Sequence, residues 1–356
     1  MALSLYLIGA PGAGKSTVFE ALTNTPQGPN FSTKGQHRLG AVKVPDPRLE
    51  RLRDLYQPKN FSPAEVAFVD VGLPPGAEEQ RSLSELTVFL GEADAFLVVV
   101  QAFGEFDYRG QAVDPAAQLE AIALEMVVAD LDKVERRLER IAQERQRGDK
   151  GLAQEAAALE RCKAHLEGEA PLRTLALEPE DAKRVRGFQF LSQKPALVVA
   201  NAGEGEADGA RVAARGEACA AMGLDHIALC APVEAEIAQL APEEQAAFLS
   251  DYGIEEAARP RLIRSAYRLL NLVSFFTVGE DEVRAWPIQR GTSAQAAAGK
   301  IHSDIERGFI RAETVDCDAL LALGAWAKCR DQGKLRLEGK TYEVADGDVI
   351  NFRFNT

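Results

Sequence analysis

Near its start the chain reads Gly9-Ala10-Pro11-Gly12-Ala13-Gly14-Lys15-Ser16-Thr17, which fits the pattern G-x-x-x-x-G-K-[ST]. The apolar run 3–8 before it predicts a strand, and residues 16–22 carry apolar side chains at helical spacing. The alternative is a chance glycine turn with an exposed lysine, which would not require a strand before it and a helix after it. In this motif backbone N–H groups surround a phosphate, Lys15 reaches the outer phosphates and the Ser16 hydroxyl binds Mg²⁺. We therefore predict a P-loop whose nucleotide-binding residues are Gly9, Gly12, Ala13, Gly14, Lys15, Ser16 and Thr17.

Further apolar runs predict the other strands of a parallel sheet. They cover residues 64–71, 95–100, 196–200 and 226–230. Strands that alternate with helical stretches are typical of a doubly wound α/β sheet. We expect a P-loop domain of this class, built from residues 1–117 and 190–272.

Residues 118–189 have a different pattern. Apolar side chains recur every three or four positions over 118–147, and a second such stripe begins at Leu152, after a polar turn at 147–151. Two long amphipathic stripes separated by a short turn predict an antiparallel helical hairpin inserted into the sheet domain.

The last eighty or so residues, 273–356, return to strand-like patterns and predict a separate α+β unit. The expected strands cover residues 282–289, 334–337, 341–344 and 349–354, with one helix over about 293–307.

Composition narrows the class of protein. The 356 residues contain no apolar run of about eighteen, and the start lacks the order of a signal peptide, so we expect a cytoplasmic protein without membrane contact. Five cysteines without a CxxC pair predict reduced thiols rather than disulfides or a zinc site. The net charge of -13 argues against general affinity for nucleic acid, and we expect no DNA binding.

Two acidic side chains follow predicted strands at positions suited to a nucleotide. Asp70 ends the apolar run 66–71, where a second acidic group would hold the water shell of Mg²⁺ beside Ser16. Asn201-Ala202-Gly203-Glu204 follows the strand 196–200, at the edge where such sheets bind their ligands. A capping aspartate and an ordinary polar turn are the alternative interpretations of these two features.

At this point the chain resembles the YchF / Obg-like ATPase family over nearly its whole length. The resemblance rests on VPDPRL at 44–49, FVD at 68–70, VDP at 113–115, DL at 130–131, VERRL at 134–138, EAEIA at 234–238, FFTVGE at 275–280, EVRAW at 282–286, GKIHSD at 299–304, GFIRAE at 308–313 and EGK at 338–340. It implies a G domain, a coiled-coil-like helical insertion at 118–189 and a C-terminal TGS domain of β-grasp type at 273–356.

The resemblance also implies slow ATP hydrolysis and association with ribosomes. The adenine preference of the family is linked to an Asn-x-x-Glu loop, which Asn201 and Glu204 match, in place of the Asn-Lys-x-Asp of GTPases. A carboxylate at Glu204 would accept a hydrogen bond from the amine of adenine and repel the oxygen of guanine. The resemblance adds Thr33 to Ser16 and Asp70 as a ligand of Mg²⁺.

The chain departs from the family at the residues associated with hydrolysis. The Asp-x-x-Gly motif is shortened to Asp70-Val71-Gly72, the glycine-rich second switch is replaced by residues 74–80, and Val98 stands where the family has a histidine. Valine cannot position water. Gln80, Gln101 or a potassium ion remain as substitutes, so the catalytic group is unknown. An ATPase with weak activity, a nucleotide-binding module without hydrolysis and, with less support, a GTPase stay open.

A ribosomal or RNA contact is expected from the insertion as well. Lys133, Arg136, Arg137 and Arg140 recur at helical spacing and would present a basic stripe to RNA phosphates. Interspersed glutamates make a simple solvated helix face the equal alternative.

Overall fold

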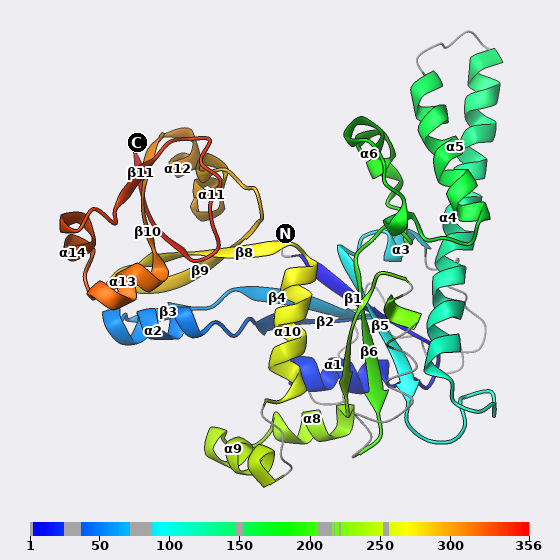
Figure 1. Ribbon diagram of the computed structural model, residues 1–356, viewed down its shortest axis with the longest axis horizontal. Coiled ribbons are helices and arrows are strands. Elements are labelled where there is room, and N and C mark those ends of the chain that lie inside the picture. Colours follow the sequence, from blue (N-terminus) through cyan, green and yellow to red (C-terminus); the bar gives the residue numbers. More distant parts are fainter. Residues whose placement is uncertain are drawn as a thin grey trace. The chain divides into compact units, whose positions relative to one another are not determined.

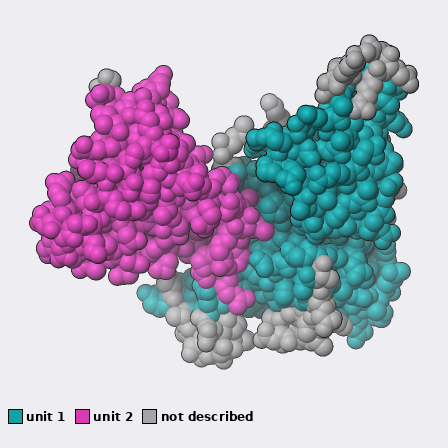
Figure 2. Space-filling view, turned by 45° about the horizontal axis from the view of Figure 1, so that its top comes forward, with its two compact units in different colours: residues 1, 3–40, 67–259 teal, residues 2, 41–66, 260–356 magenta. Residues whose placement is uncertain are grey.

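The protein is described here by a computed structural model that covers residues 3–24, 37–71, 87–146, 152–204, 216, 218–220, 222–251 and 256–355. The chain divides into two compact units. One consists of residues 3–40 and 67–259, and the other of residues 41–66 and 260–356, apart from single residues at the N-terminus (Figure 2). The boundaries expected from the sequence stay a prediction, and the structure adds that the segment 41–66 packs with the C-terminal residues.

Among the described residues, the P-loop sheet (Figure 1) consists of six strands in the order β2-β4-β1-β5-β6-β7. β1 pairs in parallel with β4 and β5, and β5-β6 and β6-β7 are parallel as well. The central strands β5 and β6 are buried along their whole length, as a sheet covered on both faces requires. The predicted doubly wound fold is confirmed. The strands are β1 (Ser4–Ile8), β2 (Arg38–Lys43), β4 (Glu65–Asp70), β5 (Ala95–Ala102), β6 (Ala196–Ala202) and β7 (Asp225–Leu229).

Helices flank this sheet. α1 begins directly after the glycine-rich loop and packs against α8. Buried residues of β5 and β6 share one apolar cluster with the first turns of α4, through Leu119, Ile122 and Met126. The helices of this unit are α1 (Lys15–Thr23), α3 (Thr87–Leu90), α8 (Ala231–Ile237) and α9 (Pro242–Asp251), while α10 (Ala258–Leu269) begins at its last residues and continues into the second unit.

The predicted helical hairpin is confirmed. α4 (Pro115–Gln146) and α5 (Ala153–Glu167) lie side by side (Figure 1) and bury an apolar stripe between them. The turn 147–151 lies outside the described residues. The return to the sheet runs through η1 (Leu172–Thr174), α6 (Pro179–Val185) and η2 (Arg186–Phe188).

The C-terminal sheet has the order β11-β10-β12-β8-β9-β3. β8 and β9 form an antiparallel hairpin, and β12 pairs in parallel with β8, which makes this an α+β unit. Its elements are β3 (Asn60–Ser62), β8 (Leu272–Val278), β9 (Glu282–Gln289), α11 (Ala294–Ile301), α12 (Ser303–Arg307), β10 (Phe309–Asp316), α13 (Cys317–Leu323), α14 (Trp326–Asp331), β11 (Arg336–Glu338) and β12 (Asp348–Phe354).

Two local expectations in this unit were wrong. The helix expected over 293–307 is two helices, because His302 is extended and its Nδ1 accepts from the Asp304 N–H at 3.1 Å, which begins α12. The strand expected over 341–344 is absent from the described C-terminal sheet. Its backbone bonds instead to the segment before α11, since the Ala294 N–H donates to the Tyr342 carbonyl and the Val344 N–H donates to the Thr292 carbonyl.

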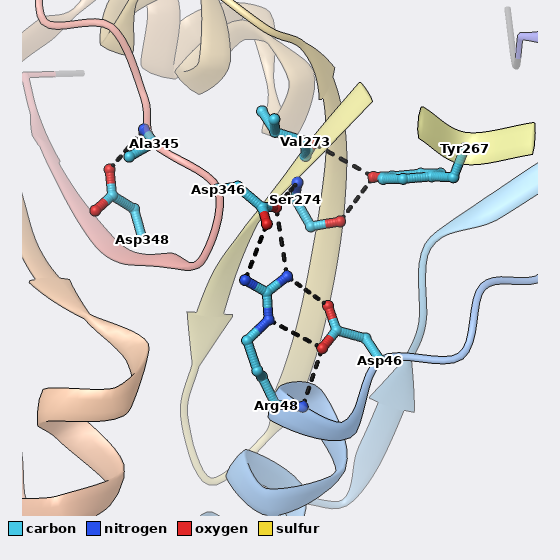
Figure 3. Close-up of polar contacts among 8 residues, drawn as sticks. All are labelled: Asp46, Arg48, Tyr267, Val273, Ser274, Ala345, Asp346 and Asp348. Carbon is cyan, nitrogen blue, oxygen red and sulfur yellow. Dashed lines mark hydrogen bonds and ion pairs between the residues drawn. The ribbon is translucent and has the colours of Figure 1, made fainter. Parts of the chain in front are cut away.

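Segment 41–66 joins this unit through α2 (Pro47–Tyr56) and β3, which pairs in parallel with β9. At the start of α2, the Arg48 guanidinium lies between the carboxylates of Asp46 and Asp346 (Figure 3). Asp346 also accepts from the Ser274 N–H at 2.9 Å, so Arg48 ties α2 to β8 and to the turn before β12. The hydrogen bonds to Asp46 and Asp346 raise the pKa of Arg48.

Replacing Arg48 by alanine should therefore destabilise the C-terminal unit by about 1.5–3 kcal/mol, the range for hydrogen bonds to charged groups. Both tryptophans, Trp286 and Trp326, lie in this unit, so their fluorescence during urea unfolding reports on it. Arg51→Ala, an exposed arginine on the same helix, is the matched control and should shift the midpoint little. Equal midpoints for the two variants would show that the Arg48 contacts are not stabilising.

Candidate nucleotide site

The turn between β1 and α1 has the geometry of an anion site. Gly14, at the N-cap of α1, has a φ of 87°, and the first turn of this helix contains no acidic residue. None of the described side chains caps it. The N–H groups and the positive end of the helix dipole are therefore available to a phosphate.

Two glycines allow close approach of other parts of the site. A Cβ atom at Gly9 would collide with the carbonyl oxygen of Val99 on β5, and one at Gly14 would collide with the amide nitrogen of Asn201. The glycine-rich loop is thus held directly against the carboxyl ends of β5 and β6, where a side chain at either position would displace it.

Lys15 folds back over the same loop. Its Nζ donates to the carbonyl oxygens of Gly9 at 3.0 Å and Ala10 at 2.9 Å. An ammonium group at the mouth of the loop is the arrangement in which a P-loop lysine can move onto a phosphate.

Ser16 and Asp70 meet beside this loop. The Ser16 hydroxyl donates to Oδ2 of Asp70 at 3.0 Å, although the two residues come from α1 and from the end of β4. Arg38 on β2 donates to the same oxygen with Nε and with a terminal nitrogen, at 3.1 and 2.6 Å, and pairs with Glu20 at 2.9 Å. Burial by itself would lower the pKa of Arg38, but these hydrogen bonds outweigh it and raise the pKa.

These residues fit a magnesium ion. The Asp70 carboxylate is 1% exposed, and its Oδ1 is buried with no hydrogen-bond partner among the described residues. A buried, unpartnered carboxylate oxygen is costly unless a ligand or water satisfies it. Together with a serine hydroxyl it offers the hard oxygen atoms that Mg²⁺ prefers. Thr33, the third expected ligand, lies outside the described residues.

The Asn201 side chain bonds to the backbone on two sides. Its amide nitrogen donates to the Ala13 carbonyl at 3.2 Å, and its amide oxygen accepts from the Ala231 N–H at 3.1 Å. The side chain is 3% exposed and joins the P-loop to the start of α8. These bonds connect β6, the P-loop and the start of α8, and the expected contact of Asn201 with the base stays a prediction. Glu204 lies exposed in the turn after β6, beyond the end of the strand.

The candidates for a catalytic group are engaged elsewhere. Val98 is 2% exposed and belongs to the apolar cluster shared with α4. The amide nitrogen of Gln101 donates to the carbonyl oxygens of Phe103 at 3.1 Å and Phe106 at 3.2 Å, which shapes the loop after β5. Gly72 and the segment 74–80, with Gln80, lie outside the described residues.

Sequence reasoning missed Arg38 and Glu20. An arginine about twenty residues after the P-loop belongs to no motif, and only the pairing of β2 beside β4 brings it to Asp70. Asp70, to which both Arg38 and Ser16 donate, was singled out by the sequence.

The basic stripe expected on the helical insertion is interrupted. Lys133 donates to the Phe188 carbonyl at 3.0 Å, and burial lowers its pKa. Arg137 is paired with Glu155 at 2.7 Å and with Glu144 at 3.5 Å. Arg136 and Arg140 stay exposed, so this face does not present four aligned cations.

The described residues contain no cluster of three or more histidine, cysteine or acidic side chains suited to holding a metal. None of the described helices is both long enough and apolar enough to cross a membrane. None of the five cysteines is bridged in the structure, and four of them are buried.

Comparison with known proteins identifies the family. Residues 272–355 match the family model YchF-GTPase_C, whose description is "Protein of unknown function (DUF933)". The "Ribosome-binding ATPase YchF" of Bacillus subtilis is 40% identical over 365 residues, and that of Escherichia coli O157:H7 is 38% identical over 362 residues, each alignment covering 100% of both chains. The structure of the Schizosaccharomyces pombe YchF GTPase superposes with a TM-score of 0.87 at 27% identity, covering 99% of this chain and 97% of that one. Full-length identity at this level, on the same fold, means that the chain belongs to the YchF family.

Proposed function

We propose that this protein is an ATP-binding P-loop NTPase of the cytoplasm that hydrolyses ATP slowly to ADP and phosphate and associates with ribosomes. The observation that carries the nucleotide part is the meeting of Ser16 and Asp70 beside the uncapped start of α1, with Lys15 over the loop. This is the arrangement of residues that a nucleoside triphosphate with Mg²⁺ requires. The ribosomal part draws support from the names of the Bacillus and Escherichia relatives.

Each residue of the site has a proposed role. Backbone N–H groups from Gly12 to Thr17 receive the phosphates, and Lys15 exchanges its carbonyl contacts for phosphate oxygens. Ser16, Asp70 and Thr33 would hold Mg²⁺, which when bound neutralises charge on the phosphates. Arg38 keeps the Asp70 carboxylate oriented toward Ser16.

The base is proposed to lie against Glu204. Asn201 holds the P-loop and the start of α8 in place, and Glu204 follows three residues later in the exposed turn beyond the carboxyl end of β6. A carboxylate there can only accept, which favours adenine over guanine. The names of the relatives differ on this point, since two curated bacterial proteins are called ATPases and the fission-yeast structure a GTPase.

A nucleotide-binding module that signals by occupancy is the second candidate. One observation favours it. Val98 packs in an apolar cluster and the Gln101 side chain donates to two backbone carbonyls, so neither side chain can orient water. We expect no partnership with DNA or with a membrane.

Calorimetric titration with ATP, ADP and GTP in the presence of Mg²⁺ tests the base assignment. ATP should bind at least several-fold tighter than GTP, and Glu204→Asp should reduce this ratio, because the shorter side chain withdraws the acceptor from the base. Glu160→Asp, the same exchange at an exposed site on α5, should leave the ratio unchanged. Equal affinities of the unmodified protein for ATP and GTP would refute the adenine assignment.

A further inference from the structure

A buried arginine lies at the proposed metal site. Arg38, the first residue of β2, is 9% exposed, and its guanidinium lies 4.9 Å from the centre of the Phe19 ring. Nε and Nη2 donate to Oδ2 of Asp70 at 3.1 and 2.6 Å, and Nη1 donates to Glu20 at 2.9 Å. All three nitrogens of the guanidinium are therefore engaged, which fixes its positive charge directly beside Asp70.

The two carboxylate oxygens of Asp70 have different surroundings. Oδ2 accepts from the Ser16 hydroxyl and from Arg38, whereas Oδ1 is buried and has no hydrogen-bond partner among the described residues. Oδ1 is thus the oxygen left for a metal ion or its bound water. Because Arg38 bonds only to Oδ2 of this carboxylate, it keeps its place whether or not a ligand satisfies Oδ1.

The position of Asp70 creates an electrostatic problem for a nucleotide. Its carboxylate is 1% exposed, so water screens its charge poorly. Ser16 joins it to the first turn of α1, where the phosphates are proposed to bind. In P-loop proteins a bound magnesium ion neutralises such charges. Arg38 provides a positive charge at the same carboxylate without a metal.

Glu20 does not cancel this effect at the phosphate site. Ser16 and Glu20 are four positions apart on α1, so Glu20 lies one helical turn, about 5.4 Å, further from the glycine-rich loop. The Asp70–Arg38 pair, which contacts Ser16, has no net charge. The repulsion that phosphates would meet from Asp70 is therefore largely removed, and only the weaker one from Glu20 remains.

We propose that Arg38 is a positioning residue that serves as an internal counter-ion of Asp70, so that the site binds ATP with little dependence on Mg²⁺. This inference rests on the proposed ATP-binding function. Orientation of Asp70 toward Ser16 would not by itself have this consequence, because an oriented carboxylate without a counter-ion still repels phosphate oxygens. ATP should therefore occupy the site both with and without the metal.

Calorimetric titration of the full-length protein with ATP tests the counter-ion role. The magnesium ratio is the Kd measured with EDTA divided by the Kd measured with saturating Mg²⁺. It should lie below about tenfold for the unmodified protein, and Arg38→Gln should raise it at least about tenfold, because glutamine keeps a hydrogen-bond donor and removes the charge. Arg38→Lys keeps the charge, and its ratio should stay within about threefold of the original.

Two further variants show whether Arg38 acts through charge on Asp70. Glu20→Gln removes the other carboxylate that shares Arg38, and should tighten metal-free ATP binding about threefold. Asp70→Asn removes the charge that Arg38 neutralises, so in that background Arg38→Gln should change metal-free ATP affinity less than about twofold.

Arg137→Gln is the matched control. Arg137 is likewise paired with two glutamates, Glu144 and Glu155, but on the helical hairpin, and its replacement should leave the magnesium ratio unchanged. Thermal melting followed by circular dichroism reports whether each variant is folded. A folded Arg38→Gln variant that loses ATP affinity equally with and without Mg²⁺ would show a merely structural arginine and overturn the proposal.

The same titrations separate this inference from the proposed function. If the unmodified protein binds no ATP even with saturating Mg²⁺, the proposed function is refuted and the counter-ion role with it. If ATP binds but the magnesium ratio of the unmodified protein exceeds about tenfold, or Arg38→Gln leaves the ratio unchanged, the counter-ion role fails and ATP binding stands.

Discussion

Alanine in place of Lys15 is expected to weaken ATP binding at least about a hundredfold, which corresponds to about 2.7 kcal/mol, while the protein stays folded. The Lys15 ammonium contacts the carbonyl oxygens of Gly9 and Ala10, at the mouth of the loop. Removing it takes away a positive charge from the phosphates and leaves these two carbonyl dipoles facing an anion. Both effects weaken ATP binding. The repulsion by the carbonyl dipoles acts only when a phosphate is bound.

Calorimetry measures this effect, with circular dichroism as the check on folding. Lys43→Ala changes the same residue type at an exposed position at the end of β2, and its ATP affinity should match that of the unmodified protein. If Lys15→Ala binds ATP normally, the glycine-rich loop is not the nucleotide site, whatever its sequence pattern.

The second large effect concerns turnover. Hydrolysis without a partner should be far slower than about one per second, a rate that corresponds to a barrier of about 17 kcal/mol. Phosphate contacts at the P-loop stabilise bound ATP, but acceleration requires a group that orients water and contacts made in the transition state. Val98 lies in the apolar cluster with α4, and Gln101 is bound to two backbone carbonyls, so β5 supplies neither.

Single-turnover phosphate release with enzyme in excess over ATP measures this rate. Parallel reactions with potassium, with sodium and with ribosomes show whether an ion or a partner completes the site. Rapid hydrolysis by the protein alone would place a catalytic group outside β5, with Gln80 the first residue to replace. Acceleration by ribosomes alone would support an ATPase controlled by its partner.

Local sequence patterns predicted much of the fold because the forces that create them are local. The glycine-rich loop requires backbone conformations and close approaches that only glycine permits, and Gly14 shows both. Buried parallel strands require continuous apolar runs, so β1, β5 and β6 were visible as such. The stripes of α4 and α5 were equally clear, because each helix must bury one face against the other.

The failures of sequence reasoning have a common cause. His302 was placed inside a helix because its neighbours favour helix, but its ring accepts a hydrogen bond that starts a new one. Lys133 and Arg137 were predicted to belong to a basic stripe. In the structure Lys133 donates to the Phe188 carbonyl and Arg137 to Glu155 on α5. In each case the hydrogen-bond partner cannot be predicted from the periodicity of apolar and charged residues.

By itself, the sequence indicated the glycine-rich loop with the helix after it, the strands β1, β4, β5, β6 and β7, the helical hairpin, the acidic residue at the end of β4 and the family; β2 was not predicted. Tertiary structure alone decided that Arg38 shares Asp70 with Ser16, that Asn201 connects β6 to the P-loop and to the start of α8, and that Glu313 accepts from two opposed arginines. It also decided that segment 41–66 packs with residues more than two hundred positions away. A residue's own chemistry and its near neighbours set the local pattern, whereas strand order and register determine which distant side chains share a charge or a hydrogen bond.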